Sequence, residues 1–326
     1  MSAKPAPPDR TAYLVLGMHR SGTSAATQLL ALLGAELPAN VMPGDEHNAK
    51  GYFEPWKIAM FNNERLRAGG GAWDDVFAFP YRPLAAEEED RWIEAAVGVF
   101  ESEFPKARFP LMKDPRVTVL LPLWRAALTR RGVTARCVIP VRHPLAVAGS
   151  LAKRDGFPVA KSVLLWTAYM LAAEAYTRDL PRVFVGYDAL LADWRREVAR
   201  IEAAHHASLP AMSDRRAREV DRFLTPDLRH NPGEGDLAAV PEVGALAAAV
   251  YDWCAAAARD EGPAADALDR AAREIAALRD RVGVFVSPVT RDLDAARTEL
   301  LDLRQRHEHL EAQVEELNRV LDALLN

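Results

Sequence analysis

The segment Gly17–Ser24 has the composition of a loop that binds an anion. It reads GMHRSGTS, and it overlaps a short apolar run, Ala12–Met18, that is typical of a buried strand and precedes a helical pattern. At such a strand-to-helix turn, successive backbone N–H groups and the positive end of the helix dipole converge on an anion. We therefore expect a phosphate-like group to bind here. The candidate ligands are His19, Arg20, Ser21, Gly22, Thr23 and Ser24.

This loop departs from the nucleotide triphosphatase pattern at one position. Its spacing is nearly G-x-x-x-x-G-K-[ST], but Thr23 stands where that pattern has the lysine that reaches the β- and γ-phosphates. The substitution argues against ATP or GTP hydrolysis, so a P-loop kinase is the weaker alternative. The simplest non-functional interpretation is an ordinary turn with capping serines.

A second candidate anion site follows a later predicted strand, Arg136–Arg142. The segment after it, RHPLAVAGSL, has Arg142 at the strand end and Ser150 about two turns into the next helix. The chain therefore offers two separate anion sites at strand ends, which suits a ligand with two phosphate-bearing ends.

Four segments together resemble sulfotransferases that use 3′-phosphoadenosine 5′-phosphosulfate (PAPS). R-S-G-T-S resembles the family's 5′-phosphosulfate loop, and Arg142 with Ser150 resembles the motif that holds the 3′-phosphate. Tyr187 begins YDALLADWRREVARI, which resembles the family's segment whose tyrosine lies near the adenine. LMKDPR (Leu111–Arg116) resembles the Lys-Asp-Pro segment of tyrosylprotein sulfotransferases. The motifs occur in the family's order and cover roughly residues 12–235.

The resemblance implies transfer of a sulfuryl group from PAPS to an acceptor hydroxyl by in-line displacement. Charge would develop on the bridging and sulfuryl oxygens, which calls for cations, and the hydroxyl would need a base. By resemblance, Arg20 stabilises the phosphosulfate and Lys113 neutralises the leaving group; a solvated lysine is the plain alternative for Lys113. Asp114 would orient Lys113 or cap the next helix. No metal is required, and the sequence shows no metal-ligand spacing.

Glu54 is the candidate base, in the segment DEHNAKGYFEP that spans residues 45–55. Its aromatic neighbours would desolvate the carboxylate and make it more basic. The alternative role for Glu54 is that of an acid before the N-terminus of the following helix. The competing candidates for the base are Asp45, Glu46 and His47. Four aromatic residues could line an acceptor cleft, although each is more often a core residue: Tyr52, Phe53, Trp56 and Trp73.

A late loop and three further histidines complete the candidates. LRHN, residues 228–231, stands among Pro and Gly, and the resemblance makes Arg229 and His230 candidates for contacts with the 3′-phosphate or adenine. This loop departs from the glycine-rich form of the cytosolic family members. His19, although it lies in the phosphate loop, and the pair His205 and His206 are expected to be solvated.

The order of predicted elements indicates an α/β, P-loop-like three-layer fold with a central parallel sheet flanked by helices. Strands at 12–18, 136–142 and 182–187, and a further one near Leu111–Arg116, alternate with helices, which predicts right-handed crossovers. We predict a disordered leader at 1–11, a sulfotransferase domain at 12–286 and a coiled-coil helix at 287–326. The sequence also predicts a helix at 117–131, another at 188–205, an irregular stretch at 205–240, and Ala-rich helices at 241–260 and 263–282.

The last forty residues have a seven-residue apolar repeat. Ser287 and Pro288 are typical of an N-cap and a first helical residue. The a positions are Leu293, Leu300, His307, Val314 and Leu321. The d positions are Ala296, Leu303, Leu310, Leu317 and Leu324. This pattern predicts a homodimer through a coiled coil; the alternative is an amphipathic helix lying back on its own domain.

Charge and composition exclude several function classes. The net charge is −5, of which the residues from Ser287 onward carry −4 (5 Lys+Arg against 9 Asp+Glu) and the rest −1 (36 against 37). A body without a basic field is not expected to bind nucleic acid. No run of 18 apolar residues predicts a membrane span, and the leader has no apolar stretch of a signal peptide, so a cytoplasmic protein is expected.

Three weaker inferences concern the source, the thiols and the acceptor. Abundant Ala and Arg with little Lys favour a bacterial source, and Cys137 and Cys254 are expected to be buried free thiols. By analogy with bacterial relatives, a carbohydrate hydroxyl is the expected acceptor. The alternative to an enzyme is a catalytically silent sulfotransferase-like module that acts through its coiled coil.

Overall fold

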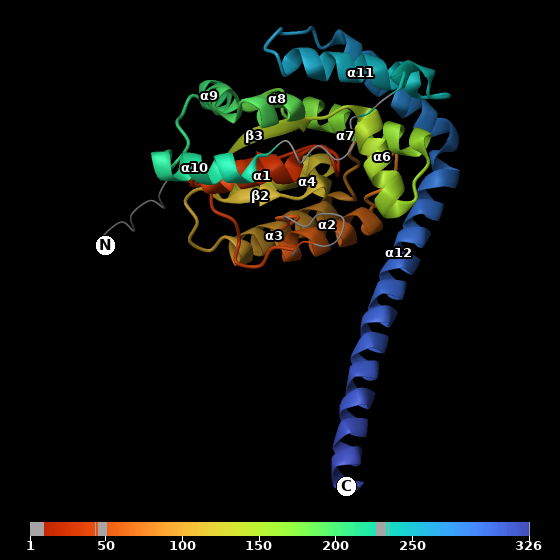
Figure 1. Ribbon diagram of the computed structural model, residues 1–326. Helices are drawn as coiled ribbons and strands as arrows, with labels where there is room; N and C mark the ends of the chain where they lie inside the picture. The colour runs from red at the N-terminus through yellow and green to blue at the C-terminus, as the bar shows by residue number, and fades with distance from the viewer. Residues whose placement is uncertain (1–9, 43, 45–50, 226–232, 234, 326) are drawn as a thin grey trace, which may run out of the picture.

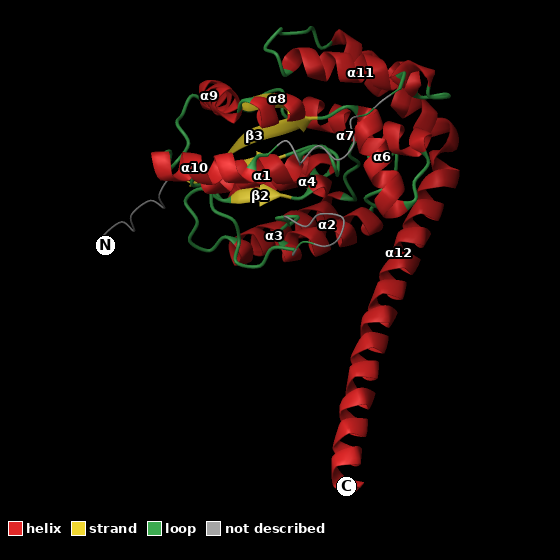
Figure 2. Cartoon of the chain, viewed as in Figure 1, coloured by secondary structure: helices red, strands yellow, loops and turns green. Residues whose placement is uncertain are grey.

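Four parallel strands form the central sheet of the computed structural model, which describes residues 10–42, 44, 51–225, 233 and 235–325 (Figures 1 and 2). The sheet has the order β2-β1-β3-β4. In its register, Val15 of β1 pairs with Lys113 of β2 and with Val138 of β3. The strands are β1 (Arg10–Val15), β2 (Leu111–Lys113), β3 (Val133–Val141) and β4 (Arg182–Gly186). The parallel sheet and its alternation with helices confirm the predicted fold class.

Helices cover both faces of the sheet, because successive side chains of a strand point to opposite faces. Tyr13 and Val15 of β1 belong to one buried cluster, and Ala12 and Leu14 belong to the other. The first cluster includes residues of α1 (Thr23–Leu32), α8 (Tyr187–Ala192), α9 (Trp194–His205) and α10 (Asp214–Phe223). The second includes residues of α2 (Trp56–Ala68), α3 (Ala86–Glu103), α4 (Pro115–Val119), α5 (Leu121–Arg130), α6 (Pro144–Asp155), α7 (Val159–Ala175), η2 (Leu237–Ala239) and α11 (Gly244–Ala257).

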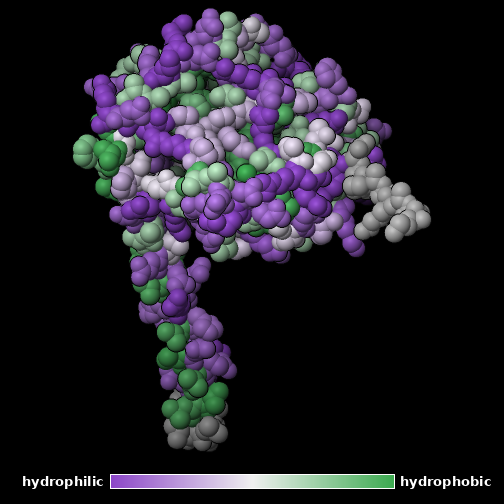
Figure 3. Space-filling model, turned by 180° about the vertical axis from the view of Figure 1, so that it is seen from behind, coloured by the Kyte–Doolittle hydropathy of each residue, from purple (hydrophilic) through white to green (hydrophobic). Residues whose placement is uncertain are grey.

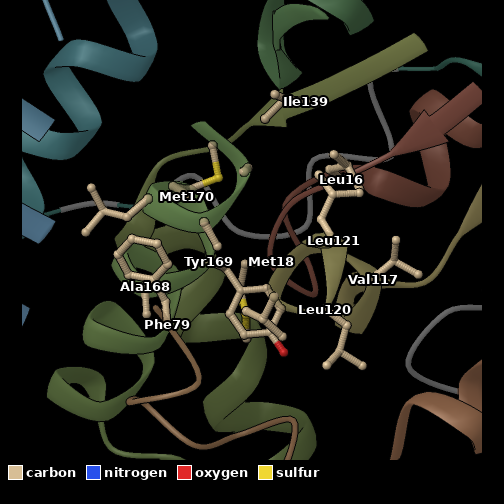
Figure 4. Packing of buried hydrophobic residues seen from close by; sticks show 14 of the residues in the cluster. Leu16, Met18, Phe79, Val117, Leu120, Leu121, Ile139, Ala168, Tyr169 and Met170 are labelled. Atoms are coloured by element: carbon tan, nitrogen blue, oxygen red, sulfur yellow. The ribbon is translucent and has the colours of Figure 1, made fainter. Parts of the chain in front are cut away.

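The second cluster lies directly beside the phosphate loop. Figure 4 shows side chains that follow β1, side chains of α4 and α5, and side chains of α7 gathered around one another. Tyr169 and Met170 of α7 are buried there with Met18, which lies inside the loop itself. The two cysteines are buried free thiols, as predicted. The loop therefore rests on a packed base.

Helix α7 is mostly apolar, and most of its residues are buried in the second cluster. In the part of the chain that the structure describes, no single helix is long and apolar enough to cross a membrane. Helices α6 and α7 reach that length and composition only as a pair, and they meet at 118°.

Several predicted boundaries are wrong, and side-chain hydrogen bonds explain two of them. β1 begins at Arg10 rather than at residue 12, and the Arg10 guanidinium donates to the carbonyls of Ala107 and Phe104. The helix predicted at 188–205 is two helices, because Asp193 caps the second by accepting from the Arg196 N–H. The helix predicted at 117–131 is also two helices, α4 and α5. The stretch predicted to be irregular contains α10.

The predicted helix start at Ser287–Pro288 is also wrong. One continuous helix, α12, runs from Asp266 to Leu325 with Pro288 inside it, so it crosses the boundary predicted at 286/287. Ser287 lies inside α12 with its side chain near Asp75, and it does not cap a helix. Thr290 and Asp294, expected in a free coiled coil, are buried against the body.

Two of the three histidines expected to be solvated are buried. His206 is exposed, but His205 and His19 are not. His205 Nε2 lies 3.1 Å from the carbonyl oxygen of Cys137, and its ring centroid lies 5.9 Å from that of Tyr13. Burial is the main reason why the pKa of His205 falls to about 4; the hydrogen bond to Cys137 opposes this shift, and the nearby Arg136 adds to it. This burial could not be predicted, because an isolated histidine belongs to no sequence pattern.

We expect His205 to make the protein acid-sensitive. Its pKa is lower in the folded than in the unfolded chain, so the unfolded chain takes up the proton first and stability falls as the pH drops from about 6.5 towards 4. Between pH 7 and pH 4, the wild-type free energy of unfolding should fall by about 3 kcal/mol more than that of His205→Gln. Urea unfolding at each pH measures this difference. Equal losses in the two proteins would contradict it.

Candidate active site

The candidate site residues lie where the four parallel strands end. The carboxyl ends of parallel strands share one edge of a sheet, where ligands of open α/β folds bind. Gly17 follows β1, Lys113 ends β2, Arg142 follows β3 and Tyr187 follows β4. The fold thus brings residues that lie up to 170 positions apart in the sequence to one edge of the sheet.

The loop after β1 has the backbone conformation of an anion cradle. Gly17, Arg20 and Gly22 have φ values of 136°, 67° and 89°, and Gly22 is the N-cap of α1. Left-handed residues among right-handed ones make a concave backbone N–H cradle. A Cβ atom at Gly22 would lie 2.3 Å from Tyr187 Cδ2, so the close approach of that ring also requires glycine.

Two polar atoms of this loop are buried without a partner among the described residues. They are Ser21 Oγ and His19 Nε2. A buried hydroxyl without a hydrogen bond is costly, and it marks a position where a ligand oxygen would be stabilised. Thr23 is also buried, whereas the Ser24 hydroxyl donates to the carbonyl oxygen of Tyr52 at 3.4 Å. These hydroxyls fit an anion held at the N-terminus of α1.

The two anion sites predicted as separate are joined in the structure. Arg20 Nε donates to Ser150 Oγ at 2.8 Å, and an Arg142 guanidinium nitrogen donates to the Arg20 carbonyl at 3.1 Å. The Arg142 guanidinium also lies 4.8 Å from the centre of the Tyr187 ring. The Arg20 side chain, assigned by resemblance to the phosphosulfate, therefore lies beside Ser150, which was assigned to the 3′-phosphate.

Arg142 is half-buried, and burial lowers its pKa against the opposing effect of Tyr187 and Asp188. The ordinary pKa of an arginine is so far above neutral that the guanidinium stays charged. A cation held at low dielectric attracts an anion more strongly than one in water. Arg142 is therefore suited to a phosphate group.

Lys113 and Glu54 form a buried ion pair. Lys113 Nζ lies 2.7 Å from Glu54 Oε1 and donates to the Tyr52 carbonyl at 2.9 Å. The exposed fractions of Lys113 and Glu54 are 2% and 3%, so the solvated lysine considered above is excluded. Glu54 precedes Pro55, the N-cap of α2, and no side-chain hydrogen bond caps this helix. The Tyr52 carbonyl accepts from both Ser24 and Lys113, which places the ion pair next to the anion cradle.

Behind this pair lie three residues that had no role predicted from the sequence: Arg116, Asn62 and Trp124. Arg116 lies 3.5 Å from Glu54 Oε2 and 2.9 Å from Asp114 Oδ1. Asp114 caps α4, which is one of the two roles predicted for it, and it also accepts a hydrogen bond from the Asn62 side-chain amide. The Asn62 side-chain oxygen in turn accepts a hydrogen bond from the Trp124 indole N–H. Burial lowers the pKa of Arg116, but Asp114 and Glu54 outweigh it and raise the pKa overall. Arg116 ends the LMKDPR segment, which was the one available signal.

His19 contributes a neutral ring. Burial lowers its pKa well below the usual value, and the positive charges of nearby arginines and of Lys113 lower it further. Its ring packs edge-on against Trp73 at 4.7 Å. A neutral imidazole can donate or accept a hydrogen bond without adding charge. His19 was expected to be solvated, and that expectation is wrong because α7 and Trp73 cover it.

The four aromatic residues proposed for an acceptor cleft are dispersed. Trp73 packs on His19 and Phe157, whereas Trp56 is about half exposed. A cavity of about 500 Å³ lies between α2, residues 69–82 and α12, and none of the four lines it. Tyr52 and Phe53 are half-buried beside Glu54.

Five candidates fall outside the described residues. They are Asp45, Glu46, His47, Arg229 and His230. Among the residues that are described, no group of three His, Cys, Asp or Glu side chains is arranged to hold a metal ion.

Comparison with known proteins finds several solved structures that resemble this chain, among them two sulfotransferase domains. No family model and no curated protein matches the chain. A sulfotransferase domain from the Synechococcus PCC 7002 olefin synthase is 18% identical, with 78% of this chain and 98% of that chain covered and a TM-score of 0.47. A sulfotransferase domain from the curacin biosynthetic pathway is 12% identical, with 64% and 77% covered and a TM-score of 0.37. Sequence identities and TM-scores this low do not assign a function to this chain. The function therefore has to be inferred from the site itself.

Proposed function

We propose that this protein is a sulfotransferase that moves a sulfuryl group from PAPS to an acceptor hydroxyl. The observation that carries the proposal is the position of the anion cradle between two charged clusters. On one side it meets Arg142 through the Arg20 carbonyl, and on the other it meets Lys113 through the Tyr52 carbonyl. A donor with a phosphate at one end and a reactive phosphosulfate at the other needs both clusters.

The cradle would bind the 5′-phosphosulfate through backbone N–H groups and the Ser21 hydroxyl. Arg142 and Ser150 would bind the 3′-phosphate, and Tyr187 would lie against the adenine. Arg20 is hydrogen-bonded to Ser150, so it would support the 3′-phosphate end unless the donor draws it to the phosphosulfate. Charge-assisted hydrogen bonds of this kind are the strong ones in proteins.

The Lys113–Glu54 pair would carry the chemistry. The acceptor oxygen forms a bond to sulfur while the bond from sulfur to the bridging phosphate oxygen breaks, and the electron pair stays on that oxygen. Lys113 would neutralise the developing charge, and Glu54 would take the hydroxyl proton. Arg116 would hold the pair in place because it contacts Glu54, and Asp114 would in turn hold Arg116. A carbohydrate hydroxyl is our predicted acceptor.

Calorimetric titration tests the donor. We expect adenosine 3′,5′-bisphosphate to bind the protein tightly and ATP to bind weakly, because Thr23 replaces the lysine that an ATP site needs. Arg142→Ala should weaken bisphosphate binding by about 10- to 100-fold, the usual loss for a charge-assisted hydrogen bond. Binding of adenosine 5′-phosphosulfate, which lacks the 3′-phosphate, should change far less.

The matched control is Arg195→Ala, which removes an exposed arginine paired with Asp221 on the protein surface. It should leave both affinities unchanged. A preference for ATP would contradict the proposed donor, and equal losses for the two ligands in Arg142→Ala would remove Arg142 from the 3′-phosphate site.

A further inference from the structure

Helix α12 leaves the body of the protein after Thr298. Its last described contacts are the ion pair of Arg67 with Asp294, the hydrogen bond of Arg67 to Thr298, and the ion pair of Arg297 with Asp74. From residue 299 to residue 321, every side chain is exposed. Figure 1 shows this part of α12 extending away from all other elements. The interpretation of a helix folded back on its own domain is therefore wrong for these residues.

An apolar stripe runs along this projecting segment. Leu300, Leu303, Leu310, Val314, Leu317 and Leu321 are 48% to 68% exposed. They recur at alternating spacings that keep them on one side of a helix, and Figure 3 shows hydrophobic residues along the projection among hydrophilic ones. So many exposed apolar side chains on one helix face mark an interaction surface. The stripe needs a partner of matching shape.

The charges beside the stripe match those of a second copy of this chain. In a parallel pair, each g position faces the e position five residues later in the other helix. Glu299 then faces Arg304, and Arg306 faces Glu311, so both pairs have opposite signs. In the antiparallel alignment that matches the a and d layers of residues 300–324, Arg304 faces Asn318 and Glu311 faces Glu311 of the other helix, so no pair of opposite charges forms. The parallel arrangement therefore has more attractive contacts.

The core positions agree with two strands in a fixed register. Leucine occupies all four d positions from Leu303 to Leu324, and His307 is the one polar residue among the a positions from Leu300 onward. Leucine at d is typical of parallel dimers, and a polar a residue specifies register at a cost in stability. Residues 299–324 provide the three to four heptads that a coiled coil requires.

We propose that the segment from Glu299 to Leu325 forms a parallel, in-register, two-stranded coiled coil with a second copy of this chain. The body does not obstruct it, because the face of α12 that packs on the body includes Thr290 and Asp294, whereas Val289 and Leu293 on the stripe side are exposed. Because α12 is one continuous helix, the coiled coil would be a direct extension of the body. It would form whether or not the chain transfers a sulfuryl group.

Two charge-reversed full-length variants test the interface. Glu299→Arg/Glu311→Arg makes all four flanking positions basic, and Arg304→Glu/Arg306→Glu makes all four acidic. We expect wild-type protein to sediment as a dimer at micromolar concentration and each variant to dissociate with a Kd raised about 100-fold by like-charge repulsion. An equimolar mixture of the two variants should form a heterodimer. Bisphosphate binding should be unchanged in both, which shows that the body is folded.

A cysteine in the stripe tests the orientation. Leu321→Cys should give a disulfide-linked dimer under mild oxidation in a parallel coiled coil, because equivalent a residues face each other. The native thiols, Cys137 and Cys254, are buried and provide an unreactive background. A monomeric wild type, a dimer that persists after deletion of residues 299–326, or a dimer in which Leu321→Cys does not cross-link would each overturn the proposal.

Discussion

Glu54→Gln is expected to lower the turnover number by about 100- to 10,000-fold, the usual contribution of a positioned general base. Glutamine has nearly the size of glutamate and keeps a side-chain oxygen that can accept a hydrogen bond from Lys113 Nζ. In the wild type, Lys113 Nζ donates to Glu54 Oε1 at 2.7 Å. The substitution removes the capacity to take the acceptor proton together with the negative charge that pairs with Lys113 and Arg116. The rate is measured as release of adenosine 3′,5′-bisphosphate from PAPS in the presence of acceptor.

Binding separates this effect from damage to the site. Because Glu54 would meet the donor site only through Lys113, whose own charge the substitution leaves in place, Glu54→Gln should bind the bisphosphate within about twofold of wild type. The matched control is Glu64→Gln, an exposed acid on the same helix, α2, whose turnover should be unchanged. A Glu54→Gln enzyme that retains a third or more of the wild-type rate would show that another residue is the base.

The positions of the site residues were largely predictable because they follow strands. A buried apolar run has a clear signature, and parallel strands bring their carboxyl ends together. The sequence therefore indicated the loop at Gly17, the lysine at the end of β2 and the arginine after β3. What it could not show is which side chains touch. Arg20 and Ser150 are 130 positions apart, and Lys113 and Glu54 are 59 apart.

Burial of single polar residues was the least predictable feature. His19 and His205 were expected in solvent, yet both lie under aromatic and aliphatic side chains contributed by distant segments. The predicted helix start at Ser287 was wrong for a related reason. Ser287 has the residue type of an N-cap, but its side chain lies near Asp75 of a loop far away in sequence, and α12 continues through it. A local pattern cannot decide between a local and a distant partner.

Lys113→Met is expected to lower the turnover number by about 100- to 1,000-fold. Removal of one group that stabilises charge in the transition state typically has this effect. Methionine has a similar length and packs well at a site that is 2% exposed, so the fold should persist. Unlike Glu54→Gln, this variant should also bind the bisphosphate more weakly, since the lost cation would contact the leaving group. The control is Lys57→Met, an exposed lysine on α2 whose nearest acid is Glu103.

The double variant Glu54→Gln/Lys113→Met decides whether the two residues act together. If Lys113 stabilises the leaving group while Glu54 removes the proton in the same step, loss of one makes the other less useful. The combined loss in rate should therefore be smaller than the product of the single losses, as is usual for residues that act as a unit. A combined loss equal to that product would mean that the two side chains, although 2.7 Å apart, serve separate steps. Lys113 would then be a donor-binding residue, and the proton of the acceptor would leave before the sulfuryl group moves.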